Sequence, residues 1–132
     1  MATWEDVERA CLALPQTAVS TAHRTRGWSV AGRPAFAWER LMRPKELADL
    51  GAAAPTGPVL AVRVPDLGAK EALLLEEPDA CFTVRSFEGL AAVLVRLDEL
   101  EPDLLTELVT EAWLARAPKR LAAAHPELGV PR

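Results

Sequence analysis

Apolar side chains recur along this chain at two spacings, and each spacing predicts one kind of secondary structure. The first group recurs at intervals of three, four and three residues, which places it on one face of a predicted N-terminal helix: Trp4, Val7, Cys11 and Leu14. Thr3 is placed to cap this helix, and Pro15 ends it because the residue before a proline resists helical angles.

Four further helices are predicted from their boundary residues and apolar stripes. They span 44–50, 67–75, 102 to the break at Pro118, and 119–124. Asp66 is placed to cap the second of these, and three of its side chains are expected to face inwards: Leu67, Ala72 and Leu74. The longest helix starts at Pro102 and carries a predicted buried stripe: Leu104, Leu105, Leu108, Val109, Ala112 and Trp113.

The second spacing is an alternation of apolar and polar positions, which predicts strands over 28–31, 35–38, 59–64, 82–85 and 91–97. A Gly-Arg-Pro turn joins the first two into a hairpin, in which Phe36 and Trp38 are expected to share one face. Arg63 and Arg85 are expected to point outwards from their strands. Short links imply antiparallel pairing, so the pattern predicts a single α+β domain over 1–132, built in two layers.

Charge is distributed unevenly along the chain. The net charge is −4, but segment 23–45 holds six bases and only one acid, Glu39. This segment therefore has a charge of +5, which leaves −9 for the rest of the chain. The six bases are Arg24, Arg26, Arg33, Arg40, Arg43 and Lys45. The whole-molecule field repels nucleic acid at long range, whereas a local basic face would bind phosphates at close range. The alternative is that these bases pair with carboxylates.

The residue patterns of common active sites are missing. The two cysteines and two histidines have no zinc-site spacing, and there is no glycine-rich phosphate loop or serine elbow. Cys11 and Cys81 lie among apolar neighbours, and we expect them to be reduced and buried. His23 lies near arginines that would disfavour its protonated form, which makes it a poor candidate base. We therefore expect no catalytic residues, no metal and no cofactor. With no signal-like N-terminus and no membrane span, we expect a cytoplasmic protein.

Four tryptophans and no tyrosine are unusual for a chain of this length. Trp4 and Trp113 lie on apolar helix faces and are interpreted as core residues. Trp28 and Trp38 lie on strands among arginines, where an indole can cover a bare sheet face or stack on a base.

Several segments, in their order and spacing, resemble the MmcQ/YjbR family of small bacterial proteins. They are the helix end Ala-Leu-Pro at 13–15, Trp28-Ser-Val-Ala-Gly-Arg-Pro-Ala-Phe-Ala-Trp-Glu-Arg40, Leu60-Ala-Val-Arg-Val64, Asp66-Leu-Gly-Ala-Lys-Glu71, Phe82-Thr83, Ala92-Val-Leu-Val-Arg-Leu-Asp98, Glu111-Ala-Trp113 and Ala117-Pro-Lys-Arg120. The match runs from Trp4 to about Ala124.

The resemblance implies a CyaY-like fold, an antiparallel sheet with helices packed on one face. The family is commonly labelled DNA-binding, through a proposed double-wing arrangement, and has no established catalytic residues. Relatives often have a lysine after the hairpin glycine, where this chain has Arg33 followed by Pro34, so the positive charge is kept. The fold name does not imply iron binding, because the first helix carries only three acids: Glu5, Asp6 and Glu8.

Three functions follow as hypotheses. The first is a non-enzymatic DNA-binding accessory protein that neutralises phosphates without reading sequence. Its predicted contact residues lie on the sheet face and hairpin: Arg24, Arg26, Arg33, Arg63, Arg85, Trp28 and Trp38. The second is a protein-interaction or small-ligand-binding module that binds no nucleic acid, since Trp and Arg are common interface residues. The third is an enzyme of unrecognised type. The protein is expected to be a monomer or a small homo-oligomer without membrane contacts.

Overall fold

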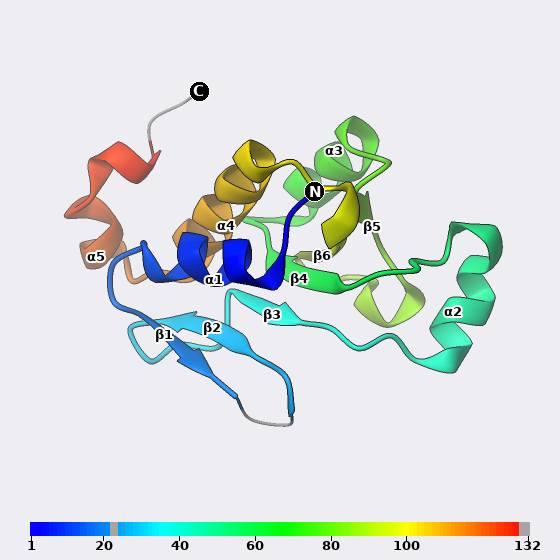
Figure 1. The fold of residues 1–132 in the computed structure, drawn as a ribbon. Coiled ribbons are helices and arrows are strands. Elements are labelled where there is room, and N and C mark those ends of the chain that lie inside the picture. Colours follow the sequence, from blue (N-terminus) through cyan, green and yellow to red (C-terminus); the bar gives the residue numbers. More distant parts are fainter. Residues whose placement is uncertain (22–23, 130–132) are drawn as a thin grey trace.

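The chain folds around an antiparallel sheet backed by helices, the predicted α+β architecture (Figure 1). The computed structural model describes residues 1–21 and 24–129, so His23 lies outside the described residues. Within them, six strands pair in the order β1-β2-β3-β4-β6-β5. The strands are β1 (Thr17–Ser20), β2 (Gly27–Val30), β3 (Ala37–Glu39), β4 (Val59–Arg63), β5 (Cys81–Phe82) and β6 (Ala92–Arg96).

The helices begin where the sequence places their caps and prolines. They are α1 (Trp4–Leu12), α2 (Pro44–Leu50), α3 (Leu67–Glu76), α4 (Pro102–Arg116) and α5 (Lys119–Ala123). The Thr3 hydroxyl accepts from the Asp6 amide while the Asp6 carboxylate accepts from the Thr3 amide, a reciprocal cap. Asp66 caps α3 by accepting from the Ala69 amide. No helix among the described residues is both long and apolar enough to cross a membrane.

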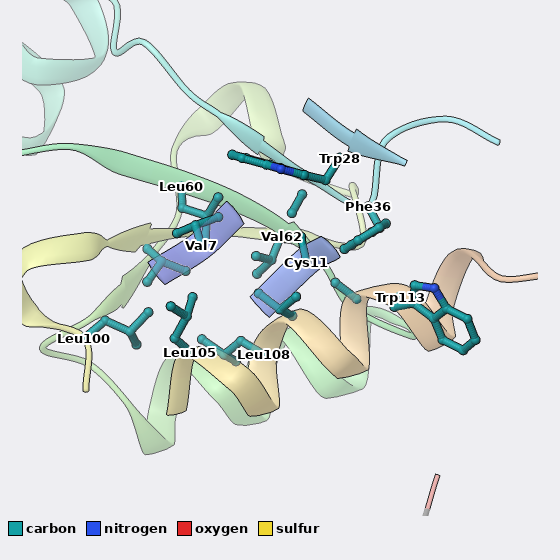
Figure 2. Close-up of a cluster of buried hydrophobic side chains, with 14 of the residues drawn as sticks. Val7, Cys11, Trp28, Phe36, Leu60, Val62, Leu100, Leu105, Leu108 and Trp113 are labelled. Carbon is teal, nitrogen blue, oxygen red and sulfur yellow. The ribbon is translucent and has the colours of Figure 1, made fainter. Parts of the chain in front are cut away.

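One face of the sheet, called here the helical face, forms the main core with α1, α3 and α4 (Figure 2). Trp28, Leu60 and Val62 point from the strands into this core and are fully buried. Val7 and Cys11 meet them from α1, as the helical spacing predicts. The predicted stripe of α4 is buried there too, apart from Leu104, which is half-buried. Because side chains alternate along a strand, the residues between these buried strand positions lie on the other face of the sheet.

The opposite face, called here the outer face, divides into a covered part and an open part. Over β4, β6 and β5, a second apolar cluster is buried: Val59, Ala61, Phe82, Val84, Phe87, Ala92 and Leu94. Met42 and Leu50 from in and around α2 pack against it, as does Leu90. Over β1 and β2 the outer face is more open, since Ala18 and Ser20 are exposed.

Alternation breaks at one point in the predicted hairpin. Phe36 and Ala37 are consecutive, yet both are buried in the main core. Trp38 therefore packs on the outer face, so the expectation that Phe36 and Trp38 share a face is wrong. The Phe36 amide donates to the carbonyl of Trp28, while Ala37 is the register partner of that same residue, an arrangement like a β-bulge.

Two other features of the structure differ from the sequence prediction. The sequence pattern does not predict the edge strand β1, because its residues Thr-Ala-Val-Ser lack a strong apolar alternation. Leu67 and Ala72 are exposed rather than turned inwards, and the buried side chain of α3 is instead Lys70. Its ammonium group donates to the carbonyls of Phe87 and Leu90, which offsets the cost of burial.

Candidate functional site

A hollow of about 270 Å³ lies on the open part of the outer face, and we call it the β2 hollow. Its lining residues come from three neighbouring strands and their links: Ser20, Thr25, Arg26, Gly27, Ser29, Arg33, Ala35 and Trp38. This list contains two arginines and no acidic residue.

The hollow exists because the outward positions of β2 are small. Gly27 and Ser29 face outwards, while Trp28 and Val30 between and after them are buried in the core. Trp38 is the register partner of Gly27 on β3, so a bulky indole stands directly beside a residue with no side chain. The predicted hairpin thus supplies both the floor and one wall of the site.

Arg63 stands on the β4 side of the same indole. Its guanidinium carbon lies 5.3 Å from the centroid of the Trp38 ring, within the range of a cation–π contact. The Nε atom of Arg63 is buried and has no hydrogen-bond partner among the described residues, and the same is true of Nε of Arg116. Burial lowers the pKa of Arg63, and the nearby positive charge of Arg116 lowers it further. The negative charge of a bound anion would favour the charged guanidinium and so oppose both effects.

Arg33 is exposed at the turn between β2 and β3 and lines the hollow. No ion pair to it occurs within the described part of the chain. Arg24 is exposed and directly precedes Thr25, another lining residue. The structure therefore places Arg33 and Trp38 in the lining of the hollow and Arg63 over the Trp38 ring, with Arg24 directly before the lining residue Thr25 in the sequence.

Arg26 contributes less than the sequence predicted. Its Nε donates to a carboxylate oxygen of Glu39 at 3.0 Å, and its amide donates to the same oxygen at 2.6 Å. Its guanidinium lies over the rings of Trp4 and Trp28, towards the helical face. The positive charge of Arg26 is therefore already compensated by Glu39.

Two predicted contact residues lie elsewhere. Trp28 has no exposed surface, so the prediction that it stacks on a ligand is wrong. The reason is strand alternation, which turns it into the core between two outward neighbours. Arg85 is exposed at the start of a short 3-10 turn, Arg85–Phe87, and does not line the hollow.

A second hollow of about 300 Å³ lies between Trp4, the end of β3, α2 and the 55–58 loop. Its charged lining residues are paired, because Glu39 binds Arg26 and Arg40 binds Glu46. Leu41 and Leu47 on its rim are exposed. This hollow offers apolar walls without an unpaired charge.

The described residues contain no group of three or more His, Cys, Asp or Glu side chains that could hold a metal ion. Cys11 and Cys81 are free and buried, as predicted. Burial raises the pKa of Cys81 to about 12 and raises the pKa of Cys11 well above its ordinary value. Neither thiol is activated as a nucleophile.

Sequence reasoning missed the small residues that form the floor of the β2 hollow. The sequence does contain a signal for this floor, since the small residues Gly27 and Ser29 alternate with the apolar Trp28 and Val30. The missing information was the pairing of β1 and β3 on either side, which turns two small side chains into a recess.

Comparisons with known proteins give relatives without an assigned activity. No family model matches the chain. The chain is similar to the uncharacterized proteins Rv2570 and MT2646 of Mycobacterium tuberculosis and Mb2600 of Mycobacterium bovis. Each is 47% identical over 127 residues, covering 94% of this chain and 95% of the relative.

A solved structure with a similar fold is that of Deinococcus radiodurans protein DR2400, which carries the domain DUF419. It matches with a TM-score of 0.67 and 21% identity, covering 99% of this chain and 91% of that chain. At this identity the likeness shows the fold alone.

Proposed function

This chain belongs to the same family as the uncharacterized protein Rv2570 of Mycobacterium tuberculosis, and from that premise we propose that it is a non-enzymatic DNA-binding accessory protein of MmcQ/YjbR type. DUF419, the domain of the similar Deinococcus structure, is the MmcQ/YjbR-like family, which supports the narrower family name. The proposed contact surface is the outer face around the β2 hollow.

The observation that carries this proposal is the charge of the hollow's lining. The chain has four more acids than bases, yet the eight lining residues include no acid. Of the two lining arginines, Arg26 is paired with Glu39, whereas Arg33 has no ion pair within the described part of the chain. Arg63 adds a further guanidinium next to Trp38. Charged groups farther apart than a Debye length, about 8 Å at physiological salt, are largely screened, so close phosphates would respond to this local surface.

Binding through phosphates would position DNA without reading its sequence. The surface is made of strands and a turn, and its arginines and hydroxyls are groups that contact backbone phosphates. We therefore expect weak, salt-dependent binding with little sequence preference, and no chemical reaction on the DNA.

The test is a matched pair of double variants. Arg24→Ala with Arg33→Ala removes two exposed arginines at the proposed surface, and Arg43→Ala with Arg120→Ala removes two exposed arginines elsewhere. Both change the net charge by the same amount. Anisotropy of a labelled duplex would be measured from about 50 mM salt upwards.

The surface variant should bind at least tenfold more weakly at low salt. Its plot of log affinity against log salt should be flatter by about 2, as expected for two lost phosphate contacts. The control variant should bind like the parent. Equal losses in both variants would show a nonspecific charge effect and overturn the assignment of the surface.

A protein-interaction module is the second candidate, favoured by a specific feature. The second hollow has Leu41 and Leu47 exposed on its rim, with relative exposures of 71% and 36%. Exposed apolar groups around a recess are typical of protein interfaces. If the parent protein binds no DNA at about 50 mM salt, this second function becomes the better proposal.

A further inference from the structure

The β2 hollow has features that a surface for duplex phosphates does not need. Phosphate contacts require only exposed cations, but this site places a half-buried indole beside a recess floored by small residues. An indole ring with access to a recess is a platform on which an unpaired base can stack. In a duplex, each base is already stacked and paired, so it cannot enter.

We propose that the β2 hollow receives one unpaired base of a single-stranded nucleic acid, with the flanking phosphates on Arg33 and Arg63. This inference rests on the proposed function and names its substrate class. The shared chemistry is an exposed base with a phosphate on each side, which single-stranded DNA and RNA both supply.

The position of Arg63 supports this assignment. Its guanidinium lies over Trp38, and it also lies near the positive charge of Arg116. The Arg63 guanidinium supplies positive charge directly beside the ring, where it would stabilise an anionic group. A phosphate at Arg63 would therefore lie beside the ring that the neighbouring base stacks on.

The walls of the hollow also suit a base edge. Thr25 and Ser29 supply hydroxyl groups, which both donate and accept hydrogen bonds. Such groups accept any base edge, so they imply little sequence preference. The absence of acids from the lining leaves no group to repel the flanking phosphates.

A substitution at Gly27 tests the recess without changing any charge. A Cβ at Gly27 would lie 3.6 Å from Cβ of Ala35 and 3.8 Å from Cβ of Trp38, ordinary contact distances. Gly27→Val therefore fits the strand, where a β-branched residue is favoured, and fills the hollow. Gly129→Val is the matched control, because a Cβ there meets nothing within 4 Å.

Each protein would be titrated with labelled oligo(dT), oligo(rU) and a DNA duplex of the same length. Gly27→Val should weaken binding to the single strands by about tenfold or more, the size of one lost base stack, and leave duplex binding unchanged. Gly129→Val should bind every probe like the parent. Trp38→Leu, with its fold verified by circular dichroism, should repeat the loss for single strands. The oligo(dT) and oligo(rU) arms distinguish a DNA source from an RNA source.

Two results would overturn the inference in different ways. If the parent binds duplex and single strand equally and Gly27→Val changes neither, the recess takes no base, while the proposed DNA-binding function stands. If the parent binds none of the three probes at about 50 mM salt, the proposed function and the inference both fail.

Discussion

Replacing Glu46 with glutamine should destabilise the fold and remove much of its sensitivity to acid. Glu46 is a buried carboxylate on α2 and accepts four hydrogen bonds. Arg40 donates to both of its oxygens, at 3.0 and 2.8 Å, and the Arg43 amide donates at 2.9 Å. The Ser86 hydroxyl donates at 3.0 Å from the segment that covers the outer face. Glu46 therefore connects α2 to the 85–90 segment, which packs over the outer face.

The magnitude follows from the pKa of this carboxyl. Burial alone would raise the pKa of Glu46, but hydrogen bonds from Arg40, Arg43 and Ser86 outweigh it and hold the pKa at about 2, against an ordinary 4.5. Because the folded pKa is the lower one, the stabilisation is present above about pH 4.5 and is lost as the pH falls towards 2. The difference corresponds to an upper bound of about 3 kcal/mol, and solvent screening of the ion pair reduces it to about 2 kcal/mol.

Urea unfolding at about pH 7 and about pH 3 measures this contribution. The parent should lose about 1–2 kcal/mol more between the two pH values than Glu46→Gln does. At neutral pH, Glu46→Gln should be less stable than the parent by about 2 kcal/mol, because Arg40 keeps its burial and loses its counter-charge. Glu71→Gln, at an exposed position of α3, controls for the removal of one negative charge. If Glu46→Gln matches the parent at both pH values, the ion pair does not stabilise the fold.

Three other predictions follow from burial. Trp28→Ala should cost about 3–5 kcal/mol of unfolding free energy, because this side chain is fully buried. Trp38→Ala should cost only about 1–2 kcal/mol, because this side chain is half-buried, and equal losses in urea would contradict the difference in burial. Lys70→Met should cost about 1–3 kcal/mol, because two backbone carbonyls lose their donor, and an unchanged urea midpoint would show that water replaces it. Cys11 and Cys81 should react with a thiol reagent at about pH 8 only after unfolding, so rapid labelling of the native protein would mean that one thiol is exposed.

The regular elements were predictable because local chemistry determines them. The reciprocal cap of Thr3 and Asp6, the proline at the start of α4 and the alternation through β4 need no information from distant residues. The predicted two-layer antiparallel architecture is confirmed for the same reason: short links and apolar periodicity constrain the choice of fold.

The burial of Glu46 and Lys70 was not predictable, because it depends on contacts with a distant part of the chain. Glu46 meets Ser86, 40 residues away, and Lys70 meets the carbonyl of Phe87, 17 residues away. From the sequence alone both side chains resemble solvated helix residues. Arg40 and Arg43 lie close to Glu46 in the sequence, but only the folding of the 85–90 segment over the outer face adds the Ser86 hydroxyl. The same segment supplies both carbonyl acceptors of Lys70, and its packing is a property of the whole fold.

The two hairpin tryptophans show why composition alone left the candidate site unresolved. Trp28 and Trp38 both lie on strands near arginines, and the sequence offers the same two interpretations for each. Alternation turns Trp28 into the core, while the break in alternation at Phe36 and Ala37 turns Trp38 to the outer face. Because one extra residue faces the core at this point, Trp28 is a buried structural residue whereas Trp38 lines the β2 hollow. The site therefore depends on the hairpin register as much as on its arginines, and a one-residue shift in register would remove the ring from the hollow without changing any charge.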